Sequence, residues 1–230
     1  PQLGTEPKTA LSKPGVYEGT TKGAPSRITE YRYPTGSRIA FNGPERAYKV
    51  HVGRVANFGV VVLSGHVTAH VTFDGAEDHI TGYPSLPLDL NPYRATYGNG
   101  VRVSAAVLPA AGTYDVVFDT RAATDAGPFS FRLWVNDKTP PRLKLKSVRG
   151  GISVAATDAG SGVDPSSIHA TIDGDAATTT WRGGVIHVNA RPGRHTLVLH
   201  VADYQETKNM EDVPPILPNT ATLRLRVKVS

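Results

Sequence analysis

The chain has 230 residues, of which 39% are hydrophobic and 20% charged, and these proportions exclude a wholly disordered chain. It contains no cysteine, which excludes disulfides and thiol-based sites, and no apolar run approaches the roughly 20 residues of a membrane-spanning helix. A net charge of +5 is modest for a nucleic-acid-binding domain, so we expect neither nucleic acid nor a membrane as a partner.

The first part of the chain is predicted to be a linker followed by a β-rich domain. Residues 1–27 begin "PQLGTEPKTALSKPG" and predict an extended linker. From residue 28 onward, hydrophobic and polar residues alternate with a period of two, and turn residues separate the alternating segments. The clearest segments are 47–53, 66–74, 101–108, 113–119 and 129–135. They predict an all-β first domain over 28–137, either a β-sandwich or a jelly roll.

A proline-rich junction precedes a second series of strands. Two prolines cannot continue the interior of a sheet, so "DKTPP" at 137–141 predicts a stiff hinge between domains. Alternating segments resume in the part of the chain after the hinge, at 142–147, 151–157, 168–174, 185–189, 195–203 and 221–229. This spacing over about 90 residues predicts an immunoglobulin-like β-sandwich over 138–230.

Acidic residues gather in two loops of this second domain. Asp158 and Asp164 follow one predicted strand, Asp203 follows another, and in an immunoglobulin-like order these two loops meet at one pole. Carboxylates on turn-rich loops are the ligands that Ca²⁺ takes, so Ca²⁺ is the candidate cofactor. Aspartate before Gly and Ser is also ordinary turn chemistry, in which the side chain bonds nearby backbone. Local capping and a calcium site therefore both stay open.

The second domain resembles the bacterial immunoglobulin-like domains that end many secreted enzymes. The resemblance rests on "TPPRLKL", "ISVAATDAGSGVDPSSIHATIDG" and "GRHTLVLHVADYQETKN". Asp203 fits the Asp that ends the sixth strand of that family, and Asn209 is a loose counterpart of the family's following Asn, where "YQETKN" replaces the usual Gly-Asn. The resemblance thus adds Asn209 to Asp158, Asp164 and Asp203 as candidate calcium ligands.

The first domain resembles pre-peptidase C-terminal sandwiches. The matching pieces are "LPLDLNPY" at 86–93 and "LPAAGTYDVVFDTRAATDAGPFSFRLWV" at 108–135. In this order the two domains resemble the C-terminal accessory region of secreted bacterial subtilisin-like serine proteases. This resemblance implies a secreted, non-catalytic segment, with the catalytic domain upstream in the same polypeptide. It would stabilise or space that domain, or engage protein substrate.

Two other surfaces suggest an alternative function as a carbohydrate- or cell-wall-binding module or an adhesin-type domain. Tyr83, Tyr93 and Tyr97 lie in the long Pro/Gly/Asn-rich interval 82–99 and, with Trp181, could form a sugar-binding surface. Basic residues alternate along two predicted strands, at Arg142, Lys144, Lys146, Arg224, Arg226 and Lys228. They could bind a polyanion, or they could protect sheet edges from association.

Overall fold

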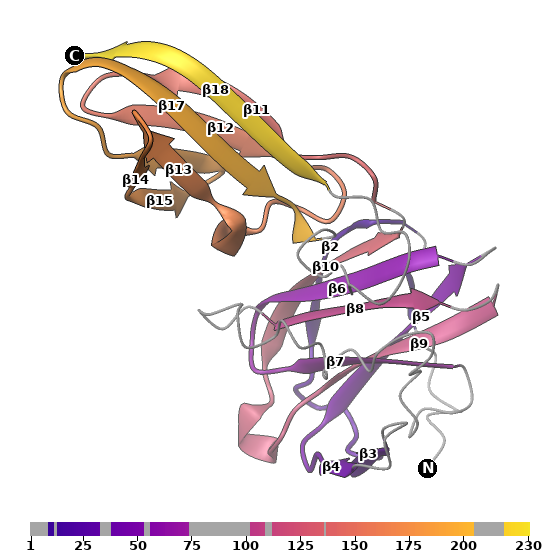
Figure 1. Ribbon diagram of the computed structural model, residues 1–230. Coiled ribbons are helices and arrows are strands. Elements are labelled where there is room, and N and C mark those ends of the chain that lie inside the picture. The colour runs from indigo at the N-terminus through magenta and orange to yellow at the C-terminus, as the bar shows by residue number, and fades with distance from the viewer. Residues whose placement is uncertain are drawn as a thin grey trace. The chain divides into compact units, whose positions relative to one another are not determined.

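The computed structural model shows an all-β chain that divides into two compact units (Figure 1). It describes residues 9–11, 13–32, 38–52, 56–73, 102–108, 112–135, 137–204 and 219–230. Among these residues, the first unit ends at Asp137 and the second begins at Lys138. The described part holds no helix with the length and apolarity that a membrane crossing requires.

Two four-stranded sheets and a short hairpin build the first unit. One sheet has the order β1 (Thr9–Leu11), β5 (Glu45–Val52), β9 (Gly112–Asp119) and β7 (Thr68–Phe73). The other has the order β2 (Gly15–Thr20), β10 (Pro128–Val135), β6 (Ala56–Ser64) and β8 (Arg102–Leu108). Strands β3 (Glu30–Arg32) and β4 (Arg38–Ala40) pair with each other, and a single turn of 3₁₀-helix covers Ala123–Asp125. All neighbours are antiparallel except β1 and β5.

An aromatic cluster fills the space between these sheets. Alternation places Phe129 and Phe131 of β10 on the inner face, where both are buried. The Phe131 ring lies 4.2 Å from that of Phe118 on β9, measured between centroids. Tyr48 of β5 contacts both rings, at 5.4 Å from Phe131 and 5.8 Å from Phe118. The first unit therefore has a core of its own, built from both sheets.

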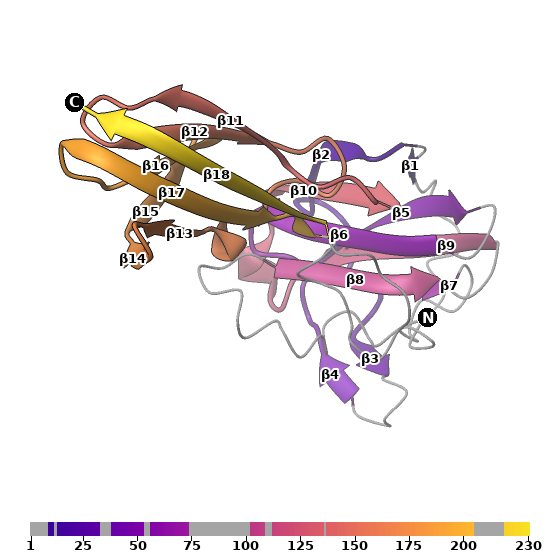
Figure 2. The same cartoon turned by 45° about the horizontal axis from the view of Figure 1, so that its top comes forward.

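The amino-terminal strands differ from the linker that we expected over residues 1–27. Strand β1 adds to β5 and β2 adds to β10, so each sheet gains one edge strand from this segment (Figure 2). Leu11 is buried, and the Tyr17 ring stacks on Phe131 at 5.5 Å. Only a few apolar residues alternate here, so the local pattern is weak, and the pairing with strands far along the chain supplies the order.

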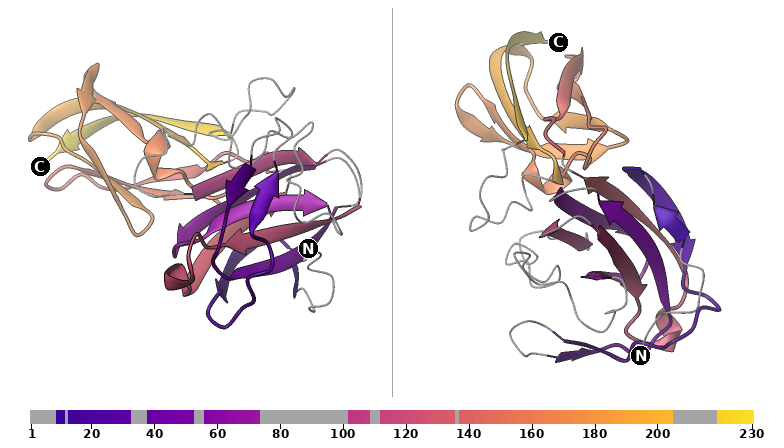
Figure 3. Two further views of the ribbon diagram at one scale, coloured as in Figure 1. Left: turned by 90° about the horizontal axis from the view of Figure 1, so that it is seen from below. Right: turned by 90° about the vertical axis from the view of Figure 1, so that its right-hand side faces the viewer.

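The second unit is a separate sandwich of two four-stranded sheets, seen from two further directions in Figure 3. One sheet has the order β11 (Arg142–Ser147), β12 (Ile152–Thr157), β16 (Val185–Val188) and β15 (Thr179–Arg182). The other has the order β14 (Asp175–Ala177), β13 (His169–Ile172), β17 (Gly193–Ala202) and β18 (Thr220–Val229). Its core is aliphatic, with Val154, Ile186, Leu197 and Leu199 among the fully buried residues.

Two tight hairpins fix the register within this unit. Asp173 and Gly174 connect β13 to β14 with positive φ at both residues, 55° and 100°. Gly183 and Gly184 connect β15 to β16 in the same way, with φ of 55° and 78°. Two left-handed residues in a two-residue loop match the twist of antiparallel strands, and Asp-Gly and Gly-Gly are pairs that this turn favours. The first of these turns positions a carboxylate that is discussed below.

Candidate functional site

The loop after β12 meets the residues that directly follow β17 at one end of the second unit. We call the acidic residues there the acidic pole: Asp158, Asp164 and Asp203, with Asp137, which directly precedes the second unit. Val163 and Asp203 form an isolated antiparallel bridge. The Asp164 amide donates to the Ala202 carbonyl at 3.0 Å, and the Tyr204 amide donates to the Gly162 carbonyl at 3.1 Å. Backbone hydrogen bonds thus hold the two acidic loops against each other.

Asp164 serves as a local cap. It is the N-cap of a 3₁₀ turn at Pro165–Ser167, and the residue as a whole is 2% exposed. Its Oδ1 atom accepts from the Ser166 amide at 2.8 Å and from the Ser166 hydroxyl at 2.6 Å. The turn-chemistry interpretation therefore accounts for this carboxylate, because a capping oxygen satisfies donors that the turn leaves open.

Asp158 also stabilises its own loop. Its Oδ1 atom accepts from the Gly162 amide at 2.7 Å. Gly162 adopts a φ of 89°, a left-handed conformation that a side chain would disfavour. The "DAGSG" segment therefore closes on itself, and this closure brings the Asp158 carboxylate to the pole.

Three carboxylates of the acidic pole converge. Asp137, Asp158 and Asp203 each offer an oxygen atom, and these atoms lie within 4.8 Å of one another. Asp203 is fully buried and Asp137 is 9% exposed. Carboxylates this close repel one another unless a cation or hydrogen-bond donors compensate their charge. Oxygen ligands on loops are suited to Ca²⁺, which would be held here by these three side chains.

The structure places three of the four predicted calcium ligands. It brings Asp158 and Asp203 together, it uses Asp164 as a cap outside the converging group, and Asn209 lies outside the described residues. Asp137, which the sequence placed in the hinge, joins the group. A signal for Asp137 existed: Arg142 pairs with Thr157, so the segment before β11 lies at the end of β12, next to the loop that carries Asp158.

Of the predicted aromatic surface, the described part of the chain includes only Trp181. Tyr83, Tyr93 and Tyr97 lie outside that part. Trp181 lies on β15 and is half-buried, packed against the core of the second unit. Its ring is therefore used at least in part for packing, as an aromatic side chain at the margin of a core commonly is.

A charged clamp joins the β13–β14 turn to the start of β17. Asp173 accepts from His195 Nδ1 at 2.7 Å through one oxygen and from the Thr196 amide at 2.7 Å through the other. His195 Nε2 lies 2.9 Å from the Arg191 carbonyl oxygen. Because both partners of the ring are pure acceptors, the ring satisfies both contacts only as an imidazolium. The hydrogen bond to Asp173 accordingly raises the pKa of His195, and the same bond lowers the pKa of Asp173.

The clamp predicts that the second unit loses stability as the pH rises. A group whose pKa is raised on folding stabilises the fold fully below its unfolded value of 6.5, and this contribution disappears as the pH passes the folded value. We expect the unfolding midpoint of the second unit to be higher at about pH 5.5 than at about pH 8.5. Thermal unfolding at both pH values checks this.

Asp173→Asn is the matched variant for that measurement. Asparagine tolerates the left-handed φ of 55° at this position, so the turn is kept while the charge is removed. We expect the difference between the two pH values to shrink in this variant. An unchanged difference would assign the pH dependence to groups other than His195.

The chain has no match among protein-family models or among curated proteins. The two sandwiches, the acidic pole, the Asp173–His195 clamp and the basic strands described below are therefore the observations from which a function is inferred. The resemblance stated from the sequence motifs adds an expectation to them.

Proposed function

We propose that the chain is a non-catalytic accessory region of a secreted subtilisin-like serine protease. In this role the two sandwiches stabilise the catalytic domain, hold it away from a surface, or engage bulky protein substrate. The partner is then the catalytic domain of the same polypeptide, and a protein substrate or cell-surface glycan is the second partner. This proposal extends the motif resemblance; its structural support comes from the architecture.

The observation that carries the proposal is that each unit has its own complete core. The first core is aromatic and the second aliphatic, and each is closed between two sheets of its own unit. Units of this kind fold around separate cores, as appended modules do. Pro140 and Pro141 at the junction restrict the backbone between them.

Strand order supports an immunoglobulin-like second unit. In immunoglobulin constant-type domains one sheet has the order A-B-E-D and the other C-F-G. Numbering the strands of the second unit from its start, β11-β12-β16-β15 corresponds to A-B-E-D. The other sheet corresponds to C-F-G, with β14 added beside the C strand. This order agrees with the family that "ISVAATDAGSGVDPSSIHATIDG" resembles.

The experiment joins the chain to the carboxyl end of a subtilisin-like catalytic domain. We expect kcat/KM for a small soluble peptide to be unchanged, because the peptide needs only the catalytic cleft. We expect a longer half-life at elevated temperature or faster hydrolysis of an insoluble protein. The proposal fails if neither property changes, or if the chain alone hydrolyses the peptide.

A further inference from the structure

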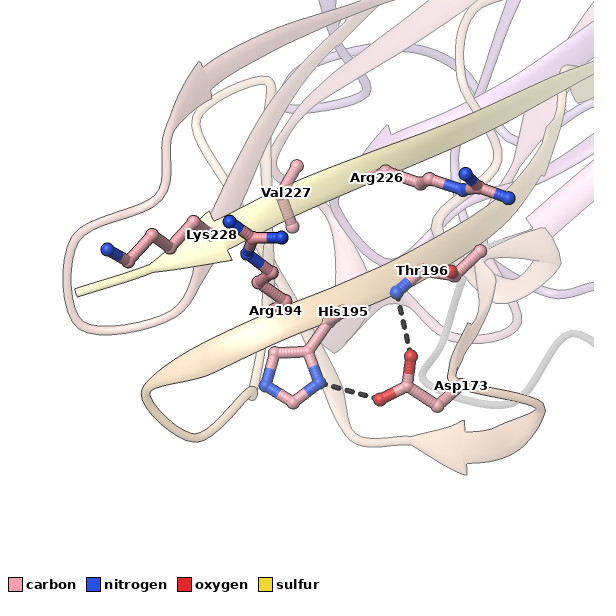
Figure 4. A pocket seen from close by; sticks show the side chains of 7 residues that line it. All are labelled: Asp173, Arg194, His195, Thr196, Arg226, Val227 and Lys228. Atoms are coloured by element: carbon pink, nitrogen blue, oxygen red, sulfur yellow. Dashed lines mark hydrogen bonds and ion pairs between the residues drawn. The ribbon is translucent and has the colours of Figure 1, made fainter.

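A basic hollow lies on the sheet that ends in β18. It has a volume of about 380 Å³ and is lined by Arg194 and Thr196 of β17 and by Arg226 and Lys228 of β18, with the Asp173–His195 clamp at its margin (Figure 4). Arg194 is the register partner of Lys228, and Thr196 is the partner of Arg226. Partners across antiparallel strands point to the same face, so these four side chains share one surface.

The positive charge of this surface is not neutralised by the described part of the chain. Arg194, Arg226 and Lys228 are exposed, and no carboxylate among the described residues forms an ion pair with them. Asp173 is the carboxylate at the margin, and its two oxygens accept from His195 and from the Thr196 amide. Arg194, Arg226 and Lys228 therefore place three positive charges beside this one carboxylate.

Edge protection explains only part of this pattern. Strand β18 is an edge strand, and Lys or Arg on an edge prevents association of sheets. Strand β17 pairs with β13 only at residues 197–200, so at Arg194 it has a strand partner on the β18 side alone. Edge protection does not explain why Arg194 lies directly across from Lys228, because like charges placed opposite each other on a strand pair are destabilising. An anion bound between Arg194 and Lys228 would offset their repulsion, because it would attract both cations.

The chemistry of the face indicates the class of anion. Arginine presents a planar fork that binds carboxylate, phosphate or sulfate through two hydrogen bonds. Alternation along β18 repeats a positive charge at Arg224, Arg226 and Lys228, about every 6.8 Å. The partners between and opposite them are Thr196, Val198, His200 and Thr222, so the described face carries hydroxyls but no Trp, Tyr or Phe on which nucleic-acid bases would stack.

We propose that the outer face of β17 and β18 binds an acidic polysaccharide, whose anionic groups are held by Arg194, Arg226 and Lys228. The threonine hydroxyls on the same face are placed to contact sugar hydroxyls. This site goes beyond the accessory role, because it assigns a ligand to the second unit whichever enzyme the chain accompanies. In a secreted protein it would hold the polypeptide at an acidic glycan surface.

Binding is tested with the full chain and three immobilised probes at low salt: heparin, polygalacturonate and single-stranded oligothymidylate. We expect binding to one or both acidic glycans, weakened by added salt because exposed charges are screened. The triple variant Arg194→Gln, Arg226→Gln, Lys228→Gln should lose about tenfold in affinity for the glycan. Each exposed ion pair contributes less than tenfold by itself, and the losses at the three positions combine.

The matched control is Arg142→Gln, Lys144→Gln, Lys146→Gln. It removes the same charge from exposed positions of β11, the edge strand of the other sheet, which lies near β18 (Figures 1 and 2). We expect it to lose less than about threefold in affinity. The site triple should unfold at a midpoint no lower than the native chain, because it removes like-charge repulsion.

Three outcomes would overturn the proposal: no binding to either glycan, equal losses in the two triple variants, or tighter binding to oligothymidylate than to both glycans. The first leaves no ligand of this class. The second means that affinity depends on the net charge of the chain and not on where the charges lie. The third indicates that the ligand is a nucleic acid. None of them bears on the protease-fusion experiment, so the two proposals can fail separately.

Discussion

Millimolar Ca²⁺ is expected to raise the unfolding midpoint of the second unit above its value in EDTA. A ligand that binds only the folded state at a hundredfold excess over its Kd stabilises it by about 2.7 kcal/mol, which corresponds to about 10–20 °C in a domain of this size. The physical reason is that Asp137, Asp158 and Asp203 place carboxylate oxygens within 4.8 Å of one another. Calorimetry of the full chain in EDTA and then in Ca²⁺ measures the shift.

Two variants decide which carboxylates are responsible. Asp203→Asn weakens the converging group and should remove most of the Ca²⁺-dependent shift. Asp164→Asn takes the same charge from the same pole but keeps a side-chain acceptor that caps as well as Asp, so it should preserve the shift. If the native chain unfolds at the same midpoint in EDTA and in Ca²⁺, the acidic pole does not bind Ca²⁺ and its aspartates only stabilise turns.

Gly59→Ala is expected to destabilise the first unit by about 1–3 kcal/mol, or roughly 10 °C in its midpoint. Gly59 of β6 is the register partner of Trp134 on β10, whose ring lies over it and is 1% exposed. A Cβ atom added at Gly59 would lie 1.9 Å from Trp134 Cζ2. The large ring is almost fully buried and cannot move aside cheaply, so backbone or ring must shift.

Gly127→Ala is the control in the same unit, since the nearest atom to a new Cβ there is the Asp125 carbonyl oxygen at 4.0 Å. Calorimetry should show its midpoint close to that of the native chain. Gly59→Ala also identifies the transition that belongs to the first unit, which the Ca²⁺ experiment needs. A Gly59→Ala chain that unfolds like the native one would mean that Trp134 adopts another position with ease.

Much of the fold could be predicted because strands that are exposed on one face carry alternating hydrophobic and polar residues. Strand β10 shows the pattern clearly, with Phe129, Phe131 and Leu133 buried. Strand β6 does not alternate: Val60, Val61 and Val62 are all buried, so a criterion based on a period of two does not detect it. Strands β1 and β2 are short edge strands whose order comes from distant partners, which no local pattern encodes.

The candidate sites were predictable only where strand order places residues together. The meeting of Asp158 and Asp203 follows from strand order, whereas the capping role of Asp164 depends on the three-residue turn that follows it. The Asp173–His195 clamp joins residues 22 positions apart through a register that the sequence does not specify. The role inferred for Arg194 likewise depends on its pairing with Lys228 across β17 and β18.

The position of β1 and β2 sets a limit on proteolytic trimming. A chain shortened to begin at residue 28 would lose the outer strand of both sheets of the first unit in one cut, leaving β5 and β10 as new open edges. Such edges present unpaired backbone donors and acceptors to other chains and promote aggregation. The amino-terminal limit of a stable first unit therefore lies ahead of Thr9, and a cut beyond it would yield an aggregation-prone fragment.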